Sequence, residues 1–209
     1  PLTVIDYNIS NVVSGKLGNH IEKNHPLFSA VKRNSSRILV IVNNLLQFFK
    51  LRYDESSYHL RPLDPDPVLR GYVDELRPSA EEKGIRISYT MSGKKGFIQA
   101  HISLFDTVML NLLTNAISGN KQGGRIDVSL DTQNDETCRI QVADNGIGLT
   151  MEELDLIFVP YVQAGNTSSG TGLGLAMVKK AVSRMNGVLE AESSKGEGTV
   201  FNLIFPKTN

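Results

Sequence analysis

The apolar residues of this chain change their spacing near residue 60, and this change limits the folds open to it. Before that point they recur every three or four positions in two runs, as in amphipathic helices. Beyond it, short segments alternate between apolar and polar residues, as strands do. The two helical runs contain Leu2, Ile5, Ile9 and Val12, and then Leu27, Val31, Ile38, Ile41, Leu45 and Phe48. An α+β protein is therefore predicted, with a helical part followed by an α/β part.

The two helical runs predict a hairpin, because Pro26 between them suits the first turn of a new helix. Two helices bury little apolar surface by themselves. An apolar seam whose residues recur about every 3.5 positions favours packing against further helices. Two hairpins from two chains would together form a four-helix bundle. We therefore predict a homodimer through residues 1–52. The alternative is that the seam packs against the second part of the same chain.

A polar segment rich in proline separates the two parts and contains Pro62, Pro65 and Pro67. We predict a dimerising helical hairpin over residues 1–55, a linker over 56–67 and a second domain over 68–209. Residues 1–52 carry seven Lys or Arg against two acidic residues, yet the whole chain has 22 basic and 22 acidic residues. The balanced total gives no general attraction to nucleic acid, and no nucleic-acid partner is expected.

Composition also indicates the cellular compartment of the chain. The single cysteine, Cys138, excludes an intrachain disulfide and favours a reducing compartment. The most apolar stretch, 38–49, is interrupted by Asn43, Asn44 and Gln47 and is shorter than the roughly 20 apolar residues of a membrane span. We expect this part of the protein to lie in the cytoplasm without direct membrane contact.

The second part reads as an α/β sandwich. We predict helices over 68–83, 103–118 and 172–186, a short helix opened by a capping box at Thr150 and Glu153, and strands over 85–91, 97–100, 125–131, 137–143, 188–193 and 199–205. Tight turns at 133–135 and 194–196 predict antiparallel pairs. The sheet should therefore be mixed, with helices on one face.

Four polar or glycine-rich segments follow one another in this domain. They are Asn111-Leu112-Leu113-Thr114-Asn115, Asp144-Asn145-Gly146-Ile147-Gly148, Ile157-Phe158-Val159-Pro160-Tyr161 and Gly170-Thr171-Gly172-Leu173-Gly174-Leu175. None fits the dinucleotide or P-loop fingerprints. Carboxamide oxygens suit Mg²⁺, a carboxylate ending a buried strand suits the amino group of adenine, and a helix N-terminus suits phosphate. Singly, they equally suit a solvated helix face, a strand-to-helix turn and a flexible linker.

Together, in this order and spacing, the four segments resemble the N, G1, F and G2 boxes of sensor histidine kinases in two-component systems. Those kinases share an ATPase fold with the DNA gyrase B subunit and heat-shock chaperones. The resemblance extends to Gly187 and to the closing segment 196–201, and upstream to segments 60–63 and 80–85. The hairpin resembles the dimerisation and phosphotransfer bundle of the same family, so nearly the whole chain is covered.

The resemblance implies ATP and Mg²⁺ as cofactors and assigns roles to individual residues. Asn115 would ligate Mg²⁺, and Asn111 would lie beside the phosphates as the catalytic residue. Asp144 would hold the adenine amino group with support from Thr199. The remaining implied nucleotide-binding residues are Gly146, Gly148, Tyr161, Gly170, Thr171, Gly172, Leu173, Gly174 and Leu175.

The implied reaction is attack by a neutral histidine imidazole on the γ-phosphoryl group, followed by transfer to an aspartate of a response regulator. This is a phosphorelay step, and full-length relatives are often anchored in a membrane. Gyrase-type relatives have a glutamate in place of Asn111, and an amide cannot act as a general base. Phosphotransfer is therefore favoured over hydrolysis.

The chain departs from the family pattern at three points. Ser118 stands where a lysine is common, and Gln163 where a lid arginine is frequent. The family's phospho-acceptor box is expected upstream of Pro1, and the four histidines present, His20, His25, His59 and His101, do not occupy that position. This segment alone is thus expected to bind ATP without phosphorylating itself. Two alternatives stay open: a nucleotide-binding scaffold without kinase activity, and a gyrase-like ATPase.

Overall fold

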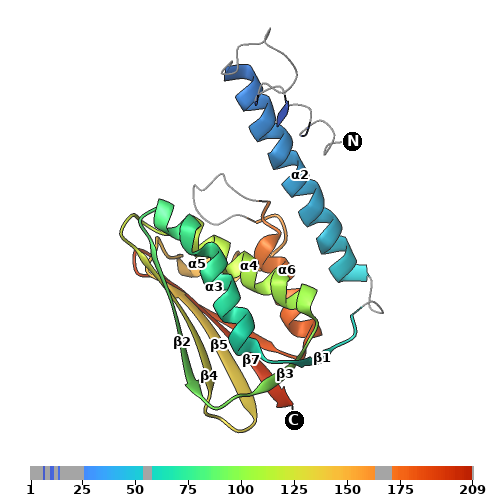
Figure 1. Ribbon diagram of the computed structural model, residues 1–209, viewed down its shortest axis with the longest axis vertical. Helices are drawn as coiled ribbons and strands as arrows, with labels where there is room; N and C mark the ends of the chain where they lie inside the picture. The colour runs from blue at the N-terminus through green and yellow to red at the C-terminus, as the bar shows by residue number, and fades with distance from the viewer. Residues whose placement is uncertain are drawn as a thin grey trace. The chain divides into compact units, whose positions relative to one another are not determined.

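The computed structural model describes residues 7, 10, 11, 14, 26–53, 58–162 and 171–208, with the backbone alone for 26–30 (Figure 1). The chain forms two compact units, Pro1–Lys50 and Leu51–Asn209. The boundary between them falls within the last turn of the long helix α2, which runs from Pro26 to Tyr53.

Helix α2 is the second helix predicted for the hairpin. It contains five basic residues and no acidic one. Three apolar residues of its predicted seam, Val31, Ile38 and Ile41, are exposed in the single chain. The first predicted helix falls mostly outside the described residues. None of the helices in the described ranges is long and apolar enough to cross a lipid bilayer.

The second unit contains the sheet. Its strands are β1 (Arg61–Leu63), β2 (Arg86–Gly93), β3 (Phe97–Ala100), β4 (Arg125–Thr132), β5 (Thr137–Asp144), β6 (Val188–Ser194) and β7 (Gly198–Thr208). Among the described residues these seven strands follow the order β1-β3-β7-β5-β4-β2, with β6 paired to β7. The β2–β4 pair is parallel and the other pairs are antiparallel, which confirms the predicted mixed sheet.

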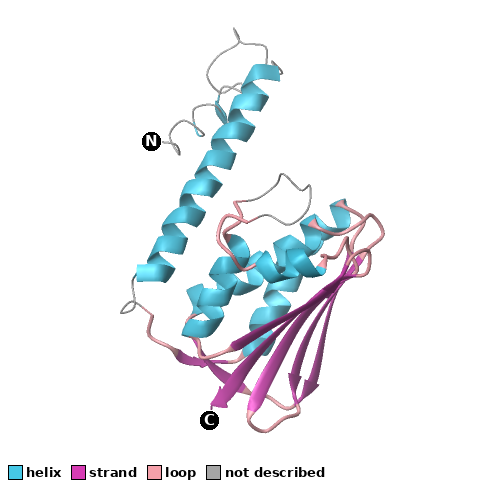
Figure 2. Cartoon of the chain, turned by 180° about the vertical axis from the view of Figure 1, so that it is seen from behind, coloured by secondary structure: helices cyan, strands magenta, loops and turns pink. Residues whose placement is uncertain are grey.

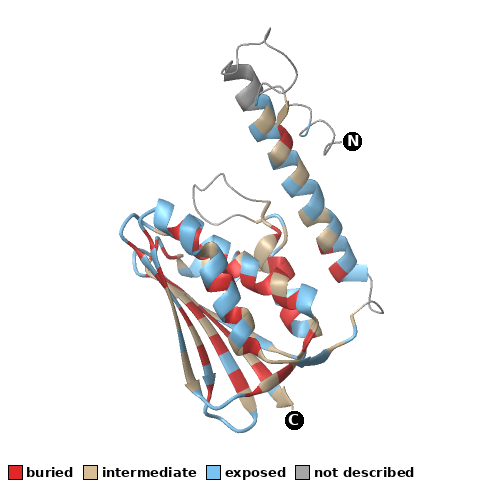
Figure 3. Cartoon of the chain, viewed as in Figure 1, coloured by how far each residue is buried: buried red, intermediate tan, exposed pale blue. Residues whose placement is uncertain are grey.

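In the described part of the domain, four helices accompany the sheet: α3 (Pro65–Glu82), α4 (Ile102–Ser118), α5 (Met151–Leu156) and α6 (Gly174–Arg184). They gather on one face of it, as predicted (Figure 2). The core lies between these two layers, where buried and exposed residues alternate along the strands (Figure 3). On the central strands β4 and β5, the buried Val128 lies opposite the buried Val142. The buried side of α4, including Phe105 and Leu112, completes this core.

The predicted linker is partly folded. Strand β1 occupies residues 61–63, and α3 begins at Pro65, three residues before the predicted start. The carboxylate of Asp64 caps α3 by accepting a hydrogen bond of 3.2 Å from the backbone N–H of Asp66. Proline suits the first turn of a helix, and Pro62 is tolerated in β1 because that strand pairs on one side alone, with β3.

The side chain of Tyr58, just before β1, contacts the ends of two helices. Its ring packs edge-on against that of His101, with centroids 5.2 Å apart. His101 is the N-cap of α4, where Nδ1 accepts a hydrogen bond from the Ser103 backbone N–H. The guanidinium of Arg184, in the last turn of α6, lies 5.4 Å from the centroid of the Tyr58 ring. One linker side chain therefore joins the start of α4 to the end of α6.

Candidate nucleotide-binding site

Asp144 is the last residue of β5 and lies opposite Thr199 on β7. Its half-buried carboxylate accepts hydrogen bonds from the backbone N–H groups of Gly146, at 2.8 Å, and of Thr199. Burial raises the pKa of Asp144, and these two hydrogen bonds offset part of the rise. A carboxylate offers about four acceptor positions. Asp144 therefore keeps acceptor capacity for a donor on a ligand.

The segment after Asp144 folds back against the end of α4. The backbone N–H of Ile147 donates to the carbonyl oxygen of Gly119, at 3.0 Å. A Cβ at Gly146 would overlap that same oxygen, and one at Gly148, where φ is +57°, would overlap the carbonyl oxygen of Ser194. Both positions therefore require glycine, which lets the loop pack closely against the backbone of Gly119 and Ser194.

Helix α4 carries the two predicted asparagines. The Nδ2 of Asn111 donates to the carbonyl oxygen of Thr107 at 2.6 Å, which leaves its Oδ1 turned away from the helix. Asn115, one turn further along, has an exposed side chain. Both residues can therefore present neutral oxygen ligands, which suit a Mg²⁺ ion that bridges to phosphates. This donor set fits the predicted metal.

Helix α6 begins next to Asn111. It starts at Gly174, two residues later than predicted, because Gly172 has φ of +67° and cannot be helical. A Cβ at Gly174 would lie 2.6 Å from Asn111 Oδ1. The Oδ1 atom of the predicted phosphate-side asparagine therefore lies beside the first turn of α6. This is the neighbourhood in which a helix N-terminus favours an anion.

Other predicted residues lie at or just before the start of α6 or contact that segment. Thr171 Oγ1 accepts a hydrogen bond of 3.3 Å from the Leu173 backbone N–H just before α6, while Leu173 is buried and Leu175 lies in the first turn. The backbone N–H of Tyr161 donates to the carbonyl of Gly172, and its side chain is 62% exposed. Gly170 and Gln163 lie outside the described residues.

These residues come from the end of β5, the side of α4 that carries Asn111 and Asn115, the start of α6 and the start of β7. A model of the histidine kinase-, DNA gyrase B- and HSP90-like ATPases matches residues 100–209, and this range contains all of those elements. The chain belongs to this ATPase family.

Known members resemble the chain over a wider range. The sensor histidine kinase ZraS of Klebsiella oxytoca is 30% identical over 182 residues, which are 87% of this chain and 38% of that kinase. The crystal structure of full-length ShkA in complex with AMPPNP has a TM-score of 0.81 at 24% identity and covers all of this chain and 46% of ShkA. ThkA, in complex with the response regulator TrrA, has a TM-score of 0.71 at 19% identity over 99% of this chain and 60% of ThkA.

The structure shows the contacts of Ser118, which stands where the family often has a lysine. The Ser118 hydroxyl donates to the carbonyl oxygen of Asn115 at 3.1 Å and so is turned back onto its own helix. Lys179, on α6, lies over the ring of Phe158, with its Nζ 5.5 Å from the ring centroid. Lys121 and Lys180 are exposed.

The sequence assigned no role to two residues near Asp144: Gly198, which lies within the matched segment 196–201, and Ser193. Gly198 has φ of +109°, and a Cβ there would overlap the carbonyl oxygen of Asp144. Ser193, on β6, bonds to both Leu149 and Gly198. A glycine directly before Thr199 was a visible signal for the first. Nothing in the sequence distinguishes Ser193 from other strand serines, because its role depends on the pairing of β6 with β7.

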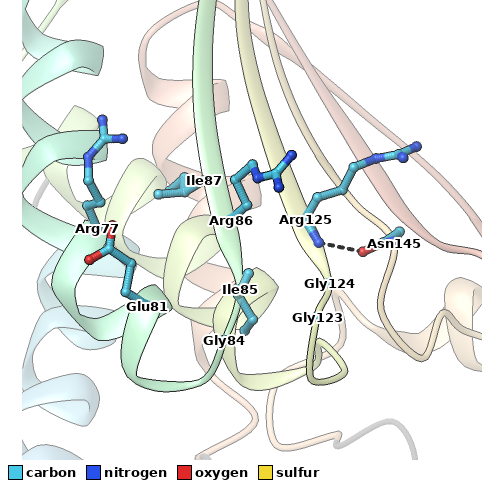
Figure 4. A pocket seen from close by; sticks show the side chains of 10 residues that line it. All are labelled: Arg77, Glu81, Gly84, Ile85, Arg86, Ile87, Gly123, Gly124, Arg125 and Asn145. Carbon is cyan, nitrogen blue, oxygen red and sulfur yellow. Dashed lines mark hydrogen bonds between the residues drawn. The ribbon is translucent and has the colours of Figure 1, made fainter.

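A separate pocket of about 530 Å³ lies where β2 and β4 begin. Figure 4 shows Arg86 and Arg125 on these neighbouring strands, with Arg77 and Glu81 on α3. None of the predicted site residues lines it. Its link to the nucleotide site is Asn145, whose Oδ1 accepts a hydrogen bond of 2.7 Å from the Arg125 backbone N–H.

Proposed function

We propose that this chain is the ATP-binding and dimerisation core of a sensor histidine kinase. In this proposal ATP is the phosphoryl donor, a histidine is the first acceptor and an aspartate of a response regulator is the second. The observation that carries the proposal is the half-buried carboxylate of Asp144, which retains acceptor capacity at the edge of a glycine-lined loop.

Selection of adenine follows from the chemistry of that carboxylate. The exocyclic amino group of adenine donates hydrogen bonds, whereas guanine offers a carbonyl oxygen at the same place. A partly desolvated acceptor gains from the first and is repelled by the second. Gly146 and Gly148 would shape the base pocket by letting the loop beside Asp144 pack closely against Gly119 and Ser194.

The triphosphate is proposed to extend from Asp144 toward α4 and α6. The backbone N–H groups at the start of α6 would donate hydrogen bonds to phosphate oxygens. The Oδ1 atom of Asn111 would lie next to these N–H groups. Asn115 would hold Mg²⁺ in the proposed site. When bound, the ion neutralises charge on the phosphates.

Transfer to a histidine is favoured over hydrolysis by the state of Asn111. An amide has no basic group to remove a proton from water, and its nitrogen is already bound to the Thr107 carbonyl oxygen. The described histidine nearest to this helix, His101, has Nδ1 engaged in capping α4. The accepting imidazole is therefore proposed to be a residue other than His101.

Three partner assignments belong to the same proposal. The solved complex of ThkA with its regulator TrrA supports a receiver domain as the second acceptor. The exposed apolar residues of α2 support a homodimer through residues 1–52. The chain spans 38% of the length of ZraS, so a sensor region and a membrane anchor of the full protein, with this part in the cytoplasm, are proposed by analogy.

A nucleotide-binding scaffold without kinase activity is the second candidate, and Ser118 favours it. The family often has a lysine there, but this hydroxyl faces the Asn115 carbonyl and supplies no positive charge to the phosphates. The scaffold would bind nucleotide weakly and pass no phosphate on.

Calorimetric titration with a non-hydrolysable ATP analogue, with and without Mg²⁺, tests the nucleotide site. Wild-type protein is expected to bind in a Mg²⁺-dependent way, and Asp144→Asn is expected to lose that binding. A folded wild-type protein that binds no analogue would contradict the proposal. A kinase assay on a chain extended upstream then separates the candidates: an acid-labile phosphoprotein supports the kinase, steady phosphate release alone supports an ATPase, and neither product supports the scaffold.

A further inference from the structure

The hydroxyl of Ser193 lies behind Asp144, at the centre of three short contacts. Its Oγ accepts a hydrogen bond of 2.8 Å from the Leu149 backbone N–H and donates one of 2.7 Å to the Gly198 carbonyl oxygen. The same Oγ is 2.9 Å from Oγ1 of Thr199, whose side chain is buried. Ser193 thus connects the loop after β5, strand β6 and the start of β7.

These contacts use the full bonding capacity of a serine hydroxyl, which is one proton and two lone pairs. The proton of Ser193 goes to Gly198, and one lone pair receives the N–H of Leu149. The remaining lone pair can only accept. The short contact to Thr199 is therefore a hydrogen bond in which Thr199 donates to Ser193.

This assignment fixes the direction of the Thr199 hydroxyl. Its proton is held by Ser193, so the rest of Oγ1 offers lone pairs alone. Thr199 is the register partner of Asp144, whose carboxylate is also an acceptor. Two neighbouring acceptors favour a ligand that brings donors and oppose one that brings a carbonyl oxygen to the same place.

We propose that Ser193 is a positioning residue that sets the base selectivity of this site by orienting Thr199. The inference rests on the proposed adenine nucleotide function and deepens it. Without the Ser193 hydroxyl, the Thr199 hydroxyl is free to turn and donate to a carbonyl oxygen. The ratio of the affinities for a 6-amino and a 6-keto purine then falls. A general loosening of the loop would instead lower both affinities equally.

ADP and IDP in the presence of Mg²⁺ are the probes, because they differ at position 6 of the base and neither carries a transferable γ-phosphate. Affinities are measured by calorimetry for wild type, Ser193→Ala, Thr199→Val and the double variant. Ser88→Ala is the matched control, since that strand hydroxyl bonds to Asp127 on the same sheet and lies outside the site. We expect Ser193→Ala to lower the ratio of ADP to IDP affinity by about tenfold and Ser88→Ala to leave it unchanged.

The double variant tests whether Ser193 acts through Thr199. The double variant should have the same ratio of ADP to IDP affinity as Thr199→Val alone, because Ser193→Ala then has no Thr199 hydroxyl to release. An equal loss of affinity for both nucleotides in Ser193→Ala would overturn the inference while leaving the proposed nucleotide function intact. If folded wild-type protein binds neither nucleotide, both are overturned.

Discussion

Asp144 illustrates at the scale of single residues how a binding site lowers the stability of its own fold. Because burial raises its pKa, the native state holds the proton more tightly than the unfolded chain does. Below the ordinary aspartate pKa of about 3.9 both states are protonated, and the group favours folding most. That contribution is lost as the pH rises through the higher native pKa.

This sign leads to a prediction for Asp144→Asn. The variant should lose nucleotide binding, yet at pH 7 its melting temperature should equal or exceed that of wild type, because no charge has to be desolvated. The difference should shrink as the pH falls toward 4. Calorimetric melting between pH 4 and 7 measures it, and a variant that is markedly less stable at pH 7 would contradict the cause given for the pKa shift.

Gly174 offers a second prediction. A Cβ in Gly174→Ala would lie 2.6 Å from Asn111 Oδ1, so Asn111 must move and nucleotide affinity should fall at least about tenfold. Gly71→Ala in α3 is the matched control, since nothing lies within 4 Å of its Cβ position. The control should gain about 0.5–1 kcal/mol of unfolding free energy and keep its affinity. Equal affinities for the two variants would disconnect Gly174 from the site.

Helix α5 depends on its ends at the scale of elements, because none of its six residues is buried. Thr150 Oγ1 accepts from the Glu153 backbone N–H, and the Glu153 side chain accepts from the Thr150 backbone N–H, which forms the predicted capping box. The same Glu153 carboxylate forms an ion pair of 3.2 Å with Lys195 in the β6–β7 turn. The cap thus determines both the helix and its contact with the sheet.

Thr150→Ala should therefore destabilise α5 by about 1 kcal/mol, and Thr150→Ser should restore most of that loss. Hydrogen exchange should show faster exchange in residues 151–156, while the amides of β4 and β5 keep their protection. Uniform acceleration across the domain would show instead that α5 unfolds together with the core.

The elements also show which parts of the fold are readable from sequence. Alternation predicted β4 and β5 closely, because one face of each is buried against the helices. Strand β1 was missed, since three residues around Pro62 carry no alternating pattern and pair on one side alone. The start of α6 was placed two residues early, because the positive φ of Gly172 depends on the hydrogen bond between its carbonyl and Tyr161.

The site divides in the same way. Asp144, Asn111 and the glycines carry chemistry in their residue types and spacing, and the structure places Asn111 against Gly174 and Asp144 against Gly146. The family resemblance also implied Thr199, but Ser193 was not predicted, because its contact with Thr199 depends on the pairing of β6 with β7. Residue identity alone therefore predicts the groups that face a ligand more readily than those that orient them.

Self-association is the property to test at the scale of the whole molecule. Val31, Ile38 and Ile41 of α2 are exposed apolar residues, and a second chain would bury them. Ile41→Asp should weaken the dimer at least about tenfold, since a buried unpaired charge is costly, whereas the exposed Asn43→Asp should change it little. Sedimentation over a range of concentrations measures this, and a wild-type monomer at every concentration would contradict the dimer.

The contacts of Tyr58 connect the linker to two helices of the ATPase domain. Its ring contacts His101 at the start of α4 and Arg184 at the end of α6, and these helices carry Asn111 and Gly174. We therefore expect a displacement of the chain at Tyr58 to change the separation of those two helices. Tyr58→Ala should speed nucleotide dissociation and lower the melting temperature, while Tyr58→Phe, which keeps the ring, should preserve both values. The dissociation rate of the bound nucleotide would then depend on the force applied to the linker at Tyr58.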